Sequence, residues 1–175
     1  MSTAQPQPMS MAETLFAQFK QEMAGTRTTL ERVPFDKAEW APHEKSMTLG
    51  RLAGHISEMT GWATAVLTTE EFDMNPVDGE GHKPVEPQSL DDILSTFDDG
   101  VSAVEAVLPG MSDEALGVHW SLRSGGEEIM GAPRSAFFRD VVTSHVIHHR
   151  AQLGVYLRLL DIPVPGMYGP SADEQ

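Results

Sequence analysis

The chain has 175 residues, of which 40% are hydrophobic, and it contains no cysteine. This suits one globular domain spanning 1–175 and excludes disulfides and protein thiolates, so that any metal must use nitrogen and oxygen ligands. A formal net charge of −14, with only 12 lysines and arginines, argues against a nucleic-acid partner, because phosphates are bound by clustered basic residues.

The sequence also carries no signal for a membrane. No apolar run approaches the roughly 18 residues that a membrane-spanning helix needs. The N-terminal segment lacks the basic stretch and apolar stretch of a signal peptide. We therefore predict a cytoplasmic protein without a membrane partner.

The first helix is predicted to begin after a flexible lead at 1–9. Ser10 and Glu13 have the spacing of a capping box, in which two side chains reciprocally satisfy free backbone donors. Apolar residues then recur every three or four positions, as on one face of a helix. Pro34 lacks the amide that would continue the helix, which therefore ends before it.

A second helix is predicted to start at Ser46 or Thr48, either of which can cap it, and to run to about Leu67. The following segment, 68–88, contains three prolines, two glycines and many acidic residues. This composition predicts a long surface loop, and loops of this length often border a functional site.

A third helix is predicted from Ser89, which with Asp92 resembles a capping box, to about Leu108. The segment VHWSLRSGGEEIMG, at 118–131, then alternates apolar and polar residues around a Ser-Gly-Gly turn. Such a pattern predicts either a short hairpin or an irregular crossover.

A long fourth helix is predicted from Pro133, which suits a first helical turn, to about Leu160. Closely spaced prolines predict an extended tail at 161–175. Four long amphipathic stretches with little strand signal predict an all-α four-helix bundle, with the hairpin or crossover joining its third and fourth helices.

Three of the seven histidines are predicted to point into this bundle. At about 100° per residue, His145 and His149 lie with the apolar stripe of the fourth helix, whereas His148 lies toward the opposite side. His55 lies near the middle of the stripe of the second helix. Buried imidazoles need polar partners, and one shared metal ion would supply a partner to all three.

Hydrogen-bonded core histidines are the alternative interpretation, and spacing alone does not decide between the two. The zinc-protease pattern needs a glutamate where Val146 follows His145, and no Glu-x-x-His pair of the di-iron bundles occurs. Away from the cluster, His43, His82 and His119 are predicted to be solvated or to support a site indirectly. Glu58, one turn from the second-helix histidine, could orient a ligand or accept a proton.

The segments WAPHEKSMTLGRLAGHI and HVIHHRAQLGVYLRLLDIPVPGMYGPSADE resemble the two signature regions of the DinB-like family, and the resemblance covers most of 10–174. The wider superfamily includes YfiT-type metal hydrolases and transferases that use bacillithiol or mycothiol. The resemblance implies a four-helix bundle, commonly a homodimer, with one divalent ion. The ligands that it implies are His55, His145 and His149.

The resemblance leaves the reaction open. With no cysteine in the chain, a thiol S-transferase would need a low-molecular-weight thiol, which is our leading interpretation. A metal-dependent hydrolase of a small-molecule substrate is the second, and a metal-stabilised binding or stress-response protein is the third. Zinc or nickel is the expected ion, with iron, copper and manganese as alternatives.

Four further side chains are candidates for contact with a substrate or cofactor. A thiol cofactor needs polar anchors for its charged groups, and these could come from Arg123, Arg134 or Arg150. Gln152 lies near the face of the fourth-helix histidine pair and could hydrogen-bond a bound ligand, although helix packing would equally explain it.

Overall fold

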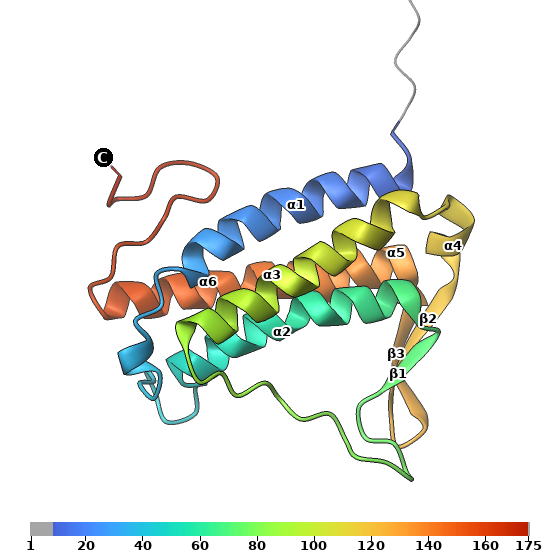
Figure 1. The fold of residues 1–175 in the computed structure, drawn as a ribbon, viewed down its shortest axis with the longest axis horizontal. Coiled ribbons are helices and arrows are strands. Elements are labelled where there is room, and N and C mark those ends of the chain that lie inside the picture. Colours follow the sequence, from blue (N-terminus) through green and yellow to red (C-terminus); the bar gives the residue numbers. More distant parts are fainter. Residues whose placement is uncertain (1–8, 175) are drawn as a thin grey trace, which may run out of the picture.

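A computed structural model describes residues 9–174 of the chain, so the predicted lead at 1–9 lies, apart from Met9, outside the described residues. Long helices dominate, and a small sheet closes one end of the bundle, opposite the C-terminal tail (Figure 1). The elements in chain order are α1 (Met11–Leu30), η1 (Phe35–Lys37), α2 (Leu49–Thr68), β1 (Glu71–Asp73), α3 (Leu90–Val107), η2 (Leu108–Gly110), α4 (Asp113–Gly117), β2 (His119–Ser124), β3 (Glu127–Pro133), α5 (Arg134–Ala136), η3 (Phe137–Thr143) and α6 (Ser144–Leu159).

The first two long helices begin where side chains satisfy their free amides. At α1, the Glu13 amide donates to Ser10 Oγ at 3.1 Å and the Ser10 amide donates to Glu13 Oε2 at 2.7 Å, which completes the predicted capping box. At α2, Thr48 is the cap, since its Oγ1 accepts from the Arg51 amide at 3.2 Å. Ser46, the alternative start, lies outside the helix.

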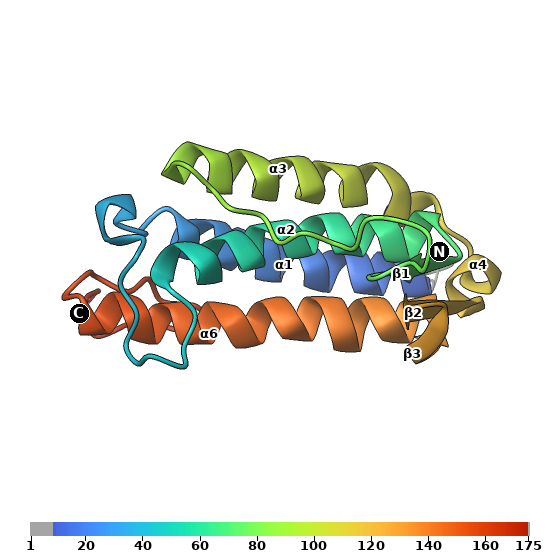
Figure 2. The ribbon, with the colours of Figure 1, turned by 90° about the horizontal axis from the view of Figure 1, so that it is seen from below.

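The long helices pack side by side around one apolar core. In Figure 2, α3 and α6 lie on opposite sides with α1 and α2 between them. The ring centroids of Phe19 from α1 and Phe138 from η3 are 5.4 Å apart. Both rings are fully buried, and so are the side chains of Leu52, Ile56 and Leu153. Burial of these side chains removes apolar area from water, which is the main favourable contribution to folding.

The prediction of a purely all-α protein is not confirmed, because a three-stranded sheet forms from 71–133 in the described chain. The predicted hairpin is present: β2 and β3 pair antiparallel around Gly125 and Gly126. Both glycines have positive φ, 64° and 80°, as a tight two-residue hairpin turn requires. β1, inside the predicted loop, pairs parallel to β2.

The predicted continuous fourth helix is also incorrect in its first part. After the short α5, the chain forms the π-helical segment η3, in which the Ser144 amide donates to the carbonyl of Arg139, five residues earlier. The Thr143 hydroxyl likewise donates to the Phe138 carbonyl at 3.1 Å. A π-segment inserts an extra residue into the helical turn, and such segments are frequent at functional sites.

The residues after α6 form no helix, as predicted, but they fold back instead of running straight. Asp173 accepts from the Val164 amide at 2.8 Å and pairs with Arg158 of α6 at 2.6 Å. Glu174 closes a second turn by accepting from the Gly166 amide at 2.8 Å. Within 9–174, no helix is both long enough and apolar enough to cross a membrane.

Gly100 marks a close approach of α3 to α2 and provides a test of this packing. A Cβ at this position would lie 2.0 Å from Thr60 Oγ1 and 2.9 Å from the Thr60 carbonyl carbon. We expect Gly100→Ala to lower the free energy of unfolding by about 1–3 kcal/mol, as overpacked cores do. Chemical denaturation measures the change.

Gly61→Ala is the matched control, because a Cβ there meets nothing within 4 Å. It should raise the free energy of unfolding by about 1 kcal/mol through helix propensity. Equal effects of the two substitutions would contradict the close crossing of α2 and α3.

Candidate metal centre

Three histidine side chains from two helices meet inside the bundle. His55 comes from α2, and His145 and His149 come from α6, one helical turn apart. One ligand nitrogen of each lies within 4.8 Å of the other two, so that the group could hold a metal ion. His55 and His149 are 7% and 8% exposed, and His145 is half-buried. The structure thus brings together the three ligands expected from the sequence.

Hydrogen bonds fix which nitrogen faces the centre in two of the three rings. His55 Nδ1 lies 2.7 Å from Glu58 Oε1, and His149 Nδ1 lies 2.7 Å from Gln152 Oε1. Because these oxygens accept, each Nδ1 carries the proton and each Nε2 keeps its lone pair. The Nε2 atoms of His145 and His149 are 2.8 Å apart. This is the arrangement of metal-ligating imidazoles held by neighbouring acceptors.

Glu58 is itself held by three donors. Its side chain is buried, 5% exposed, and besides the His55 ring it accepts from the Val85 amide at 2.9 Å and from Arg51 Nη2 at 3.2 Å. Burial alone would raise the pKa of this carboxyl, but the hydrogen bonds from His55 and Val85 and the charge of Arg51 outweigh it and lower the pKa. Glu58 is therefore an ionised acceptor that orients His55.

The imidazoles of His145 and His149 are kept neutral by their surroundings. Burial, with contributions from His149, His55 and His148, lowers the pKa of His145 to about 4. Burial also lowers the pKa of His149, in opposition to its hydrogen bond with Gln152. A neutral imidazole has a lone pair to donate, and an all-nitrogen donor set suits zinc, nickel, copper or iron. The residues present therefore fit a divalent transition-metal ion.

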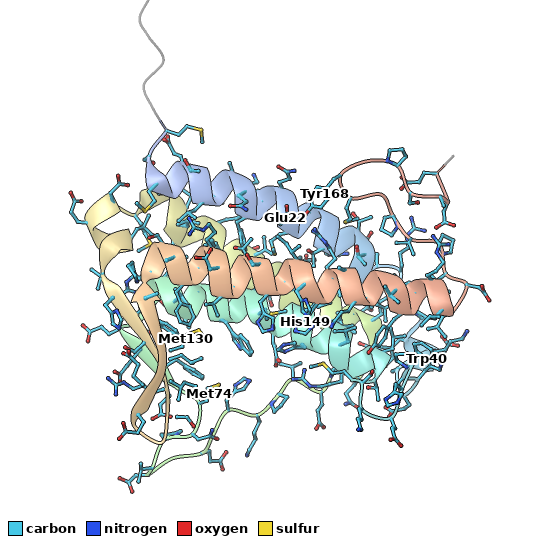
Figure 3. The ribbon with its side chains drawn as sticks, turned by 180° about the vertical axis from the view of Figure 1, so that it is seen from behind. Glu22, Trp40, Met74, Met130, His149 and Tyr168 are labelled. Carbon is cyan, nitrogen blue, oxygen red and sulfur yellow. The ribbon has the colours of Figure 1, made fainter. Side chains whose placement is uncertain are left out.

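A cavity of about 320 Å³ opens beside His145, toward the sheet. Its walls come from α2, from the chain around β1, from the hairpin and from η3. Figure 3 shows Met74 and Met130 on the sheet side of His149. The lining residues are Trp62, Ala65, Val66, Phe72, Met74, His82, Trp120, Leu122, Met130, Phe137, Val141, Val142 and His145.

The remaining histidines lie outside the cluster. His148 is exposed, on the side of α6 predicted from the sequence. His43 and His119 are exposed as well, and His119 Nε2 contacts Glu128 at 3.1 Å. His82 lies closer, because its Nε2 is 3.9 Å from Glu58 Oε2 and its ring lines the cavity. The sequence predicted that His82 is either solvated or supports a site indirectly, and the structure favours the indirect role.

The three arginines considered as cofactor anchors are engaged elsewhere. Arg150 is buried on the opposite side of α6, where it pairs with Glu22 at 2.7 Å and donates to the Tyr168 hydroxyl at 2.8 Å. Figure 3 shows Glu22 and Tyr168 across α6 from His149. Arg134 donates to carbonyl groups at the end of α2, and Arg123 pairs with Glu71 in the sheet.

Two contributors to the centre were not found from the sequence. Arg51 lies one turn before His55, so the helical projection that found His55 could also have placed it beside Glu58. Val85 contributes only its backbone amide from a long loop, and no side-chain pattern reports such a contact. Gln152, which was predicted to hydrogen-bond a bound ligand, accepts through its Oε1 from the His149 ring.

Comparison with known proteins places this geometry in context. The model of the DinB family matches residues 1–175. A DinB-like protein from Bacillus cereus ATCC 10987 is similar in structure, with a TM-score of 0.66, 23% identity, and coverage of 89% of this chain and 97% of that one. A DinB-like protein from Bacillus subtilis has a TM-score of 0.64, 17% identity, and coverage of 93% and 98%. No curated protein matches the chain.

Glu58→Gln tests the support of the ligand His55. A glutamine amide offers one acceptor oxygen where the carboxylate accepts from His55, Val85 and Arg51, so at least one donor loses its partner. We expect Zn²⁺ affinity to fall by about 10–100-fold, as for other groups that orient metal ligands. Competition with a chromophoric chelator measures the affinity. Glu70→Gln, at an exposed position, should leave it unchanged, and equal affinities of the two variants would exclude the orienting role.

Proposed function

The chain belongs to the DinB family, and from that premise we propose that it binds one divalent metal ion through His55, His145 and His149 and transfers a low-molecular-weight thiol to a small electrophilic substrate. The observation that carries the proposal is the convergence of three imidazoles, with ligand nitrogens within 4.8 Å of one another, beside an apolar cavity. Zinc or nickel is the ion that we propose.

Each residue of the centre has a distinct part in this proposal. Glu58 and Gln152 hold the Nδ1 atoms of two ligands, so that their Nε2 atoms face the ion. A divalent ion bound with an open position acts as a Lewis acid and lowers the pKa of a water or thiol that it binds. The apolar cavity walls exclude water from the side where the electrophilic substrate approaches.

Thiol transfer is favoured over hydrolysis by the state of Glu58. A hydrolase commonly uses a base that takes a proton from the attacking water, and the nearest carboxylate here already accepts from three donors and has a lowered pKa, so that it is a weak base. A thiol would need such a base less than water does, because the pKa of a free thiol, about 8.5, lies well below that of water, about 15.7. In the reaction its sulfur bonds to an electrophilic carbon, the leaving group departs with the bonding electrons, and the thiol proton passes to water.

Arg51 is the residue that we propose as the anchor for the thiol. Its Nη2 donates to Glu58, whereas its Nη1 is buried and has no hydrogen-bond partner among residues 9–174. Arg51 also lines a second cavity, of about 360 Å³, together with Glu39, Glu86 and Gln88. A cationic group beside carboxylates and an amide suits a thiol that carries both a carboxylate and an amine.

Neighbouring histidines of α6 provide the test of the ligand set. His149→Ala and His55→Ala should each weaken Zn²⁺ binding by at least tenfold, whereas His148→Ala, at an exposed position, should leave it nearly intact. Calorimetric titration of metal-free protein measures the affinities. Metal should also raise the melting temperature of the native protein, because it binds the folded state. Equal losses at 148 and 149 would contradict the helical phase.

Turnover of the metal-loaded protein tests the reaction. We expect conjugation of bacillithiol, mycothiol or cysteine to electrophiles, and we expect His149→Ala to abolish it. A parallel panel of esters and amides measures hydrolysis. Activity in the ester and amide panel alone would replace transfer by hydrolysis, and no turnover in either panel would leave a metal-stabilised binding protein.

A further inference from the structure

The cavity beside His145 has a composition that selects among substrates. We infer that it binds the electrophilic substrate of the proposed reaction, and that this substrate is a neutral, flat aromatic molecule. The inference rests on the proposed function for its chemical step, but its physical basis is the cavity alone. Apart from two imidazoles, the side chains that line it are apolar or aromatic.

The wall offers few polar atoms to a guest. Trp120 is buried, and its Nε1 donates to Thr69 Oγ1 at 3.1 Å, so that its ring offers the cavity carbon atoms only. His82 contacts the rings of Trp62 and Phe72, with centroids 5.8 and 6.1 Å away. A charged or strongly hydrated ligand would lose its water here without gaining partners, which makes its transfer unfavourable.

The volume sets the size of the ligand. A cavity of about 150 Å³ accommodates benzene, and this one has about 320 Å³. It therefore suits two rings or one substituted ring. Aromatic walls favour edge-to-face and offset contacts with a flat guest, and the thioethers of Met74 and Met130 adapt to its outline and contact ring edges.

The wall of the cavity is exposed at Phe72 and Met130. Phe72 is 37% exposed and Met130 is 47% exposed, whereas Phe137 and Val142 are buried at 3% and 2%. His145 belongs both to the wall and to the ligand group. A molecule that enters past Phe72 and Met130 thus reaches the metal-binding side of the bundle, where its reacting carbon can meet the thiol.

Two fluorescent probes with one skeleton test the selectivity. 2-Naphthol is uncharged near neutral pH and has two fused rings, and 6-hydroxynaphthalene-2-sulfonate differs from it by a sulfonate. In metal-free protein, we expect the neutral probe to bind at least tenfold more tightly. Equal affinities, or preference for the sulfonate, would overturn the inference.

Substitutions in the cavity wall test where the neutral probe binds. Ala65→Trp fills the cavity from α2 and should weaken binding of the neutral probe at least tenfold, whereas Ala106→Trp, the same change at an exposed position of α3, should not. Met130→Lys places a charge on the half-exposed wall and gives the same test without overpacking. Unchanged binding in both Ala65→Trp and Met130→Lys would place the probe elsewhere.

Loading the protein with Co²⁺ tests whether a probe in the cavity lies close to the metal centre. In Co²⁺-loaded protein, the proton resonances of the bound neutral probe should broaden strongly, whereas Zn²⁺-loaded protein should show no such broadening. Broadening no greater than with zinc would overturn the assignment of the cavity to the substrate. Failure to bind either metal overturns the proposed function and is seen in the metal titration, whereas failure to bind the neutral probe overturns only the substrate class.

Discussion

The buried carboxylate of Glu58 is the group on which the centre depends. It fixes His55 within its own helix, and it also accepts from the Val85 amide, 27 residues away in the chain. The loop that leads back from the sheet to α3 (Figure 1) is thereby attached to α2 beside His55. A buried carboxylate without these donors would be strongly unfavourable, so the loop, the helix and the ligand orientation stabilise one another.

The orientation of α6 has a second determinant on its other side. His149 and Arg150 are consecutive and therefore point about 100° apart. Arg150 is buried against Glu22, Thr26 and Tyr168. Breaking a buried ion pair leaves an uncompensated charge, which costs about 3–5 kcal/mol, so rotation of α6 is resisted. The residue expected to hold a cofactor instead keeps the neighbouring histidines directed at α2.

The features predicted from the sequence are those governed by local rules. The caps at Ser10, Thr48 and Ser89 and the inward phase of the three histidines follow from side-chain chemistry and helical periodicity. β1 was missed because three residues in a polar loop carry no pattern, and its parallel partner lies about 50 residues away. η3 was missed because no pattern of apolar residues distinguishes a π-segment from an α-helix. The π-segment is recognised by its hydrogen bonds, which join residues five apart.

The departures from a regular bundle lie together at one end of the molecule. β1, the hairpin and η3 all contribute walls to the cavity beside His145, while α2 supplies the remaining side. An ideal four-helix bundle would close this space with interdigitating side chains, because protein interiors pack densely. Here the sheet replaces helical packing at the end of α2, and η3 alters the helical path immediately before the first α6 ligand. β1 and η3, which periodicity does not predict, therefore help to form the cavity beside the three-histidine group that periodicity does predict.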